Sequence, residues 1–241
     1  MKRSATVEGW EDEAAAIIEH CCPEMIVLDL DFTIWPTFFA EHTLPPYVCL
    51  DAVPEEYPST VLCVDRSTRK PRTLSLYSCV RSTISWCLQR GIRLSVCSRS
   101  SNYHGAEAIL KCLGMWNVFE CPQIYSGRKT LHFRNLRGCT NIPYSDILFF
   151  DDDQRNIKVC GGIGVTCTLV NRSIGFDGWT LLEGLKQHAR AKACNYTPCS
   201  WEIHALKKAK SVEEDDTLSD DSESSDDTRS RDFTFHRCAT V

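Results

Sequence analysis

The stretch Met25–Trp35, MIVLDLDFTIW, constrains the fold more than any other part of the sequence. Its first four residues are apolar, which predicts a short strand buried on both faces, as in a parallel sheet. Unpaired carboxylates are costly in a dry core, so Asp29 and Asp31 should lie where this strand emerges, at the edge where open α/β sheets bind ligands. Residues two apart point the same way from an extended backbone, so both acids can face one ligand or cation. The simpler alternative is a solvated Asp-x-Asp loop without a function.

Apolar and helical patterns recur along the chain. Strands are expected at 92–97, 119–125, 146–150 and 165–170. Helices are expected at 8–20, around 106–113, in a short segment after 156 and at 200–210. A further helix is expected between Ser78, as its N-cap, and Gly91, which ends it, and another at 178–193, with Asp177 as its cap. Strands that alternate with helices at this spacing predict a parallel sheet covered on both faces.

A proline-rich insertion interrupts this alternation after Trp35. It cannot form a long helix, because proline lacks the N–H and clashes with the preceding turn. The segments 60–64 and 72–77 are β-rich and flank a polar turn at 66–70, which predicts a hairpin. An insertion at this place would overhang the Asp29 and Asp31 end of the sheet and act as a flap.

The net charge of −5 is unevenly distributed. Residues 212–241 carry 10 acids and 3 Lys/Arg, a net charge of −7, whereas the other 211 residues carry 24 Lys/Arg and 22 acids, a net charge of +2. A near-neutral body without a basic stripe argues against nucleic-acid binding. The acidic, serine-rich end has too few apolar residues to form a core and is expected to be a disordered tail.

The chain contains 15 cysteines and no C-x-x-C pair, which argues against a zinc ribbon. Their number is odd and no secretory signal precedes them, so we expect reduced thiols that pack as small hydrophobic residues. No apolar run is long enough to cross a bilayer. These features predict a soluble protein of the cytoplasm, with the nucleus as the alternative.

Polar residues follow four of the predicted strands. They are Asp29, Asp31 and Thr33; Ser98 and Arg99; Lys129; and Asp151 and Asp152. Each group alone has an ordinary explanation as a turn residue, a solvated lysine or a helix cap. Together they supply two acid pairs, hydroxyls and an amine at one edge of the sheet, which indicates a single site.

These segments resemble the haloacid-dehalogenase (HAD) superfamily of hydrolases, and more closely its magnesium-dependent phosphatase family. The similar motifs are DLDFTIWP at 29–36, Ser98-Arg99, GRKTLHF at 127–133, FFDDDQRNI at 149–157 and GVTC at 164–167. The resemblance covers about residues 24–190 and departs from the family at Ser78, where a proline is expected, and in the larger insertion. It implies a Rossmann-like fold, a parallel sheet flanked by helices, with a small β-hairpin flap instead of a large cap domain. The domains expected are an N-terminal extension (1–23), a phosphatase domain (24–210, with the flap at 36–77) and an acidic tail (211–241).

The resemblance also implies roles for individual residues. Asp29 would attack phosphorus, and Asp31 would act as the general acid and base. Thr33, Ser98, Arg99 and Lys129 would bind the phosphate. Mg²⁺ prefers oxygen ligands, and it would be bound by the carboxylates of Asp29 and Asp152 and the backbone carbonyl of Asp31, with Asp151 in an outer position or as a direct ligand.

The function implied is a Mg²⁺-dependent phosphomonoesterase that forms an aspartyl-phosphate and acts on phosphotyrosine-like or sugar-phosphate-type substrates. Asp31 favours monoester hydrolysis over dehalogenation, because a halide leaves without a proton. Two alternatives remain: a phosphoserine/threonine protein phosphatase of the same superfamily, and a non-catalytic phosphate-binding scaffold. The expected partner is a phosphate monoester, either a small molecule or a phosphoprotein, and neither nucleic acid nor a membrane; the oligomeric state is left open.

Overall fold

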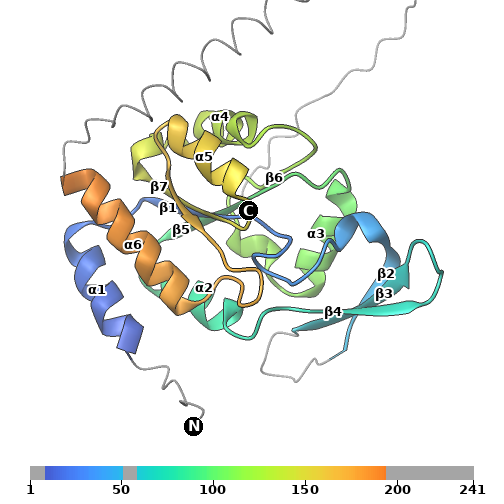
Figure 1. Cartoon of the computed structure of the whole chain (residues 1–241). Helices are drawn as coiled ribbons and strands as arrows, with labels where there is room; N and C mark the ends of the chain where they lie inside the picture. The colour runs from blue at the N-terminus through green and yellow to red at the C-terminus, as the bar shows by residue number, and fades with distance from the viewer. Residues whose placement is uncertain (1–8, 51–58, 194–241) are drawn as a thin grey trace, which may run out of the picture.

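A five-stranded parallel sheet forms the centre of the protein (Figure 1). The computed structural model describes residues 9–50 and 59–193. The strand order is β6-β5-β1-β7-β8. The strands are β1 (Met25–Leu28), β5 (Arg93–Ser98), β6 (Gln123–Ile124), β7 (Ile147–Asp151) and β8 (Thr166–Leu169). β1 is central and pairs in parallel with both β5 and β7, which confirms the predicted parallel sheet.

Side chains of β1 alternate between two cores, because successive residues of a strand point to opposite faces. Ile26 and Leu28 pack in the core beneath α1, α2, α3 and α6. Met25 and Val27 pack in the core beneath α4 and α5. Figure 1 shows α4 and α5 on one side of the sheet and α2 and α6 on the other. The helices are α1 (Trp10–His20), α2 (Val80–Gln89), α3 (Tyr103–Cys112), α4 (Lys129–Thr140), α5 (Gln154–Gly162) and α6 (Gly178–Ala193), with 3₁₀ turns η3 (Trp116–Val118) and η4 (Tyr144–Asp146).

Most predicted elements are present, with three differences. The N-cap of α2 is Cys79 and not Ser78, and it makes no side-chain capping bond. The strand expected over 119–125 is reduced to β6, at Gln123–Ile124. Helix α4 was not predicted, because its apolar face is sparse: it buries Phe133 and Leu136 but is otherwise mostly polar.

The insertion forms a three-stranded antiparallel sheet, β2-β3-β4, which lies beside the main sheet (Figure 1). It follows the 3₁₀ turn η2 (Ala40–His42) and comprises β2 (Thr43–Cys49), β3 (Thr60–Asp65) and β4 (Pro71–Ser75). The β3–β4 pairing confirms the predicted hairpin. β2 was not expected, since Pro45 and Pro46 remove two backbone donors. The loss of these donors is tolerated because β2 is an edge strand, where one row of backbone donors needs no partner.

Two cysteine pairs are disulfide-bonded, Cys49–Cys112 and Cys121–Cys139. The expectation that all cysteines are reduced is therefore wrong for these four. The first bond connects β2 to the last residue of α3, so the insertion is covalently tied to the main domain. The other eight described cysteines are free thiols.

No helix in the described part of the chain is both long and apolar enough to pass through a bilayer. The helix predicted at 200–210 and the tail predicted at 211–241 lie outside the described residues, as do residues 1–8 of the N-terminal extension.

Candidate active site

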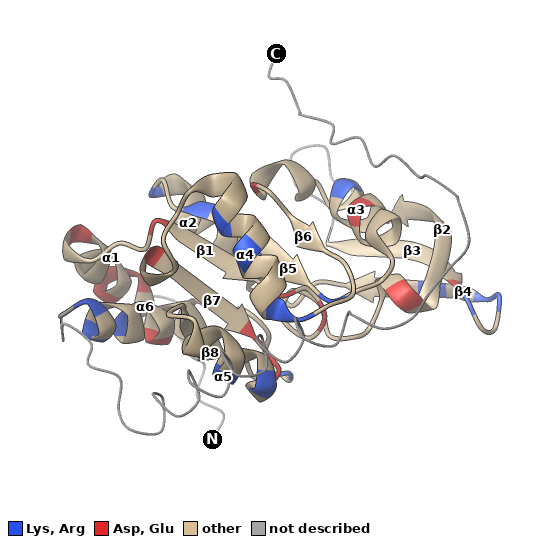
Figure 2. Ribbon diagram, turned by 90° about the horizontal axis from the view of Figure 1, so that it is seen from above, with Lys and Arg blue, Asp and Glu red and all other residues tan. Residues whose placement is uncertain are grey.

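The carboxyl end of β1 brings Asp29 into contact with a buried lysine. The amide of Asp29 still donates to the carbonyl of Phe150 on β7, so the strand pairing fixes its backbone. Lys129, the first residue of α4, is 1% exposed. Its Nζ lies 2.5 Å from Asp29 Oδ1 and 3.1 Å from Asp151 Oδ2, and it also donates to the carbonyl of Cys97. In Figure 2 the basic start of α4 lies beside the acidic end of β7.

Asp151, the last residue of β7, is fully buried and held by its neighbours. The side-chain amide of Asn156 donates to both of its carboxylate oxygens at 3.0 Å, and the backbone N–H of Asp153 donates to Oδ1 at 2.8 Å. Sequence analysis did not identify Asn156. Its position in the first turn of α5, five residues after Asp151, is the signal that could have revealed it.

Three carboxylates gather at this place. Ligand oxygens of Asp29, Asp151 and Asp152 all lie within 4.8 Å of one another, and no other such group occurs in residues 9–50 and 59–193. Oxygens around an octahedral Mg²⁺ lie at most about 4.2 Å apart, twice the metal–oxygen distance. Small side-chain adjustments would therefore fit the three acids to Mg²⁺, which also prefers such hard oxygen ligands.

Burial and charge act against each other in this cluster. Burial raises the pKa of Asp29, the Lys129 ammonium opposes this, and Asp151 adds to the rise. Burial alone would lower the pKa of Lys129, but Asp29 and Asp151 hold it above its usual value, so the amine stays protonated. Burial and Asp151 raise the pKa of Asp152, and Arg172 opposes them through an ion pair of 2.6 Å. The raised pKa values of Asp29 and Asp152 mean that their negative charge is poorly compensated in this cluster, which favours a bound cation.

Asp31 does not belong to the carboxylate cluster, and its side chain makes hydrogen bonds of its own. Its Oδ1 accepts from the indole N–H of Trp35 at 2.7 Å and from the amide of Phe39 at 3.2 Å. Burial raises the pKa of Asp31, and these two donors lower it. Trp35 is fully buried and belongs to the core.

Ser98 and Arg99 lie at the carboxyl end of β5, next to β1. Ser98 is almost completely buried, and its Oγ accepts from the amide of Ser100 at 3.3 Å. Arg99 is exposed and makes no ion pair with any residue that the structure describes.

A cavity of about 320 Å³ connects these groups. Six of the eight residues predicted for the site line it: Asp29, Asp31, Ser98, Arg99, Lys129 and Asp152. Asp151 is buried and does not line the cavity, and Thr33 is buried with a hydroxyl that has no partner within the described ranges. We call three of the buried lining residues, Asp29, Ser98 and Lys129, the floor of the cavity.

The mouth of the cavity consists of exposed or partly exposed residues: Phe38, Glu41, Arg99, Arg155 and Arg172. Of these, sequence analysis identified Arg99 alone. Glu41 belongs to the insertion, and its carboxylate accepts from the amide and hydroxyl of Ser101 at 2.9 and 3.2 Å. No local motif marks Glu41 or Phe38, because the fold alone places them over the cavity.

Comparison with known proteins agrees with this geometry. Residues 21–191 match the family model described as "Acid Phosphatase". The chain is 31% identical over 170 residues to "Magnesium-dependent phosphatase 1" of Homo sapiens, covering 70% of this chain and 89% of the human protein. It is 25% identical over 175 residues to a "HAD-like hydrolase superfamily protein" of Schizosaccharomyces pombe, covering 69% of this chain and 94% of that protein.

The family match spans the sheet, the insertion and all the residues that line the cavity. The acids that such an enzyme needs to bind its metal are present and close together. The chain therefore belongs to the acid phosphatase family of HAD hydrolases and is a magnesium-dependent phosphatase.

Proposed function

We propose that this phosphatase hydrolyses phosphomonoesters in two steps, through an aspartyl-phosphate on Asp29. The observation that carries the proposal is the position of the Asp29 carboxylate, which lines the cavity and is 2.5 Å from the Lys129 ammonium. Carboxylate nucleophiles divide a difficult displacement into two easier ones. Mg²⁺ held by Asp29 and Asp152, with Asp151 in an outer position, would reduce the repulsion between Asp29 and the phosphate.

Lys129 and Ser98 would bind the phosphoryl oxygens from the floor. Lys129 is protonated and cannot move away, because Asp29, Asp151 and the carbonyl of Cys97 hold its Nζ. Such fixed positive charge stabilises a transition state without reorganisation during the reaction. Arg99, exposed beside Ser98, would bind a non-bridging oxygen or another part of the substrate. Thr33 stays a sequence prediction, because its hydroxyl is buried and does not line the cavity.

Asp31 would protonate the leaving oxygen and then deprotonate the water that hydrolyses Asp29-phosphate. It lines the cavity two residues after Asp29, and its raised pKa suits a group that must carry a proton at the start of the reaction. Acid–base help of this kind typically contributes about 10²–10⁴ in rate.

The aromatic side of the mouth favours phosphotyrosine-like substrates. Phe38 is 51% exposed and lines the cavity, and its ring packs edge-to-face on Phe32 with centroids 4.9 Å apart. An aryl leaving group could stack there, whereas an aliphatic phosphoserine would gain less. Sugar phosphates remain the second substrate class of this proposal, and a cytoplasmic location stays a prediction.

The intermediate can be tested by chemical trapping. The enzyme is mixed with p-nitrophenyl phosphate and Mg²⁺, quenched in acid and treated with borohydride, which reduces an acyl phosphate to an alcohol. Peptide mass spectrometry should then find homoserine at position 29, and none when EDTA replaces Mg²⁺. Trapping of a different residue, or turnover without any trapped acyl group, would contradict the two-step route. A panel of phosphotyrosine, phosphoserine and sugar-phosphate esters assigns the substrate class.

A further inference from the structure

Four cationic side chains line the cavity, and they differ in how many hydrogen-bond acceptors hold them: Arg99, Lys129, Arg155 and Arg172. Lys129 is buried and held by three acceptors. Arg155 is bound through Nε and Nη2 to both carboxylate oxygens of Asp153, two residues before it. Arg172 makes one ion pair, from Nε to Asp152 Oδ2 at 2.6 Å. In the described part of the chain its two terminal nitrogens have no partner, and its side chain is 56% exposed.

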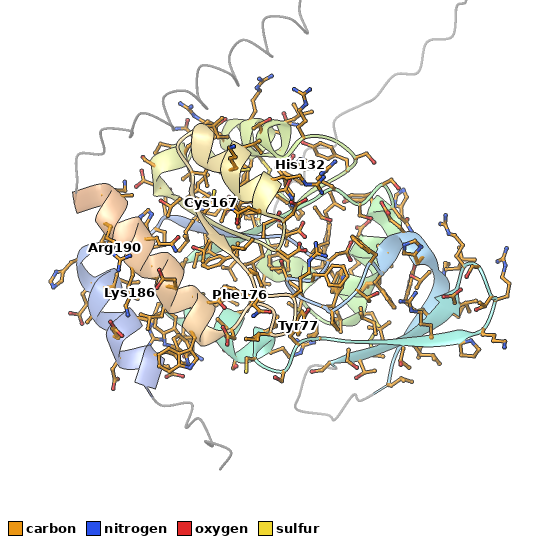
Figure 3. All side chains as sticks on the ribbon, viewed as in Figure 1. Tyr77, His132, Cys167, Phe176, Lys186 and Arg190 are labelled. Carbon is orange, nitrogen blue, oxygen red and sulfur yellow. A yellow bond between two sulfur atoms is a disulfide. The ribbon has the colours of Figure 1, made fainter. Side chains whose placement is uncertain are left out.

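The backbone of Arg172 is fixed, although it lies in a loop. The amides of Ile174 and Gly175 donate to the carbonyl of Asn171 at 2.9 Å, and the hydroxyl of Tyr77 donates to the carbonyl of Arg172. Gly175 has a φ of +79° and is so close to the Tyr77 ring that a Cβ atom there would lie 2.1 Å from it. Figure 3 labels Tyr77 and Phe176, the residue that follows Gly175.

The same loop is hydrogen-bonded to the segment that follows Asp29, the proposed nucleophile. The amide of Phe176 donates to the carbonyl of Thr33 at 2.8 Å. The guanidinium carbon of Arg172 lies 4.8 Å from the centroid of the Phe32 ring, and Phe32 contacts Phe38. Arg172 is therefore held between the candidate metal ligand Asp152 and the aromatic side of the mouth.

We propose that Arg172 determines specificity: its free terminal nitrogens bind a second anionic group on the leaving-group part of the phosphomonoester. The end of a guanidinium can bind a carboxylate or phosphate through two parallel hydrogen bonds. With Phe38 lining the same cavity, this arrangement selects an aryl phosphate that carries a nearby negative charge, such as phosphotyrosine next to an acidic group. The inference rests on the proposed phosphomonoesterase function and extends it.

A matched pair of substrates isolates this interaction. 3-Carboxyphenyl phosphate and its methyl ester have similar leaving groups, but only the acid carries the second charge. We expect the wild-type enzyme with Mg²⁺ to favour the acid by about tenfold in kcat/KM, as for one charge-assisted hydrogen-bonded pair. Arg172→Gln should reduce this ratio to about one, and Arg172→Lys should retain part of it.

Two controls separate this role from simpler ones. If Arg172 merely orients Asp152, Arg172→Gln lowers kcat/KM for both substrates equally, and the ratio is unchanged. If positive charge at the mouth is sufficient in general, Arg155→Gln also abolishes the preference. Either result overturns the inference, and we expect Arg155→Gln to keep the wild-type ratio.

The test also distinguishes the inference from the function on which it rests. Equal wild-type turnover of the acid and the ester overturns the role of Arg172 and leaves the phosphomonoesterase intact. Turnover of neither ester with Mg²⁺ contradicts the proposed function. In that case the non-hydrolysable 3-carboxyphenylphosphonate and its carboxyl methyl ester still test Arg172 by calorimetry. We expect the acid to bind about tenfold more tightly to wild type and equally to Arg172→Gln, and equal wild-type affinities overturn the inference.

Discussion

The floor and the mouth of the cavity differ in burial and in the elements that contribute their residues. The floor is buried, comes from β1, β5 and the start of α4, and is held by contacts between residues far apart in sequence, such as Lys129 with Asp29. The mouth comes from the insertion, from loops and from the first turn of α5, and its side chains are partly or fully exposed. A floor of this kind suits the chemical step, which needs fixed charges. The mouth can vary without disturbing that step, so we expect it to set substrate preference.

The largest effect is expected for Asp29→Asn at the floor. The amide cannot attack phosphorus, so kcat for p-nitrophenyl phosphate should fall by roughly 10⁴-fold or more. The melting temperature should not fall, because the substitution removes one of the clustered buried negative charges and leaves Lys129 paired with Asp151. Steady-state kinetics and thermal denaturation check both points; retained turnover in a folded variant would remove Asp29 as the nucleophile.

Lys129→Met should damage both stability and activity. It leaves Asp29 and Asp151 buried without their counter-charge, and breaking a buried ion pair costs about 3–5 kcal/mol. We expect an unfolding free energy lower by about that amount in urea titrations at pH 8, and kcat lower by about 10²–10³.

A surface pair provides the control for that variant. Lys111 lies 2.8 Å from Glu107 on α3, and its side chain is 56% exposed. Lys111→Met should cost less than about 1 kcal/mol. Similar losses for the two lysines would show that the floor is no more strongly coupled than an ordinary surface pair.

Glu41→Gln tests the mouth and should act on binding. The amide can still accept from Ser101, but the negative charge that faces an anionic substrate is gone. KM should fall about two- to fivefold at low salt with little change in kcat, and the difference should vanish near 1 M salt, where screening extends over about 3 Å. Glu183→Gln, on α6 and away from the cavity, should leave KM unchanged. A large change in kcat for Glu41→Gln would place this residue in the chemical step.

The smallest effect is expected in the β3–β4 turn of the insertion. Hydrogen bonds from Ser67 and Thr68 hold the pKa of Asp65 well below its usual value. A carboxyl group with a lowered pKa stabilises the fold fully above about pH 4, its unfolded pKa, and loses this contribution as the pH falls. Asp65→Asn should therefore lower the melting temperature slightly at pH 6 and progressively less toward pH 2. A difference that stays constant with pH would mean that the charge of Asp65 contributes nothing.

Most of the floor could be predicted from sequence because its residues follow apolar strands. Asp29 after β1 and Ser98 at the end of β5 lie where parallel strands end, and parallel strands end at one edge of the sheet. Asp152, which lines the cavity outside the floor, follows β7 in the same way. Lys129 was identified through its motif, although its helix α4 was not predicted. The disulfides could not be predicted, because pairing depends on which cysteines the fold brings together.

By itself, the sequence determined the parallel sheet, the family and the acids at the carboxyl ends of β1 and β7, since strand periodicity and short motifs are local properties of the chain. The tertiary structure alone decided the burial of Thr33, the position of Asn156 beside Asp151, and the meeting of Phe38, Glu41 and Arg172 at the mouth. These residues are contributed by different segments, and no local pattern records how far an insertion reaches over a cavity or which loop faces it.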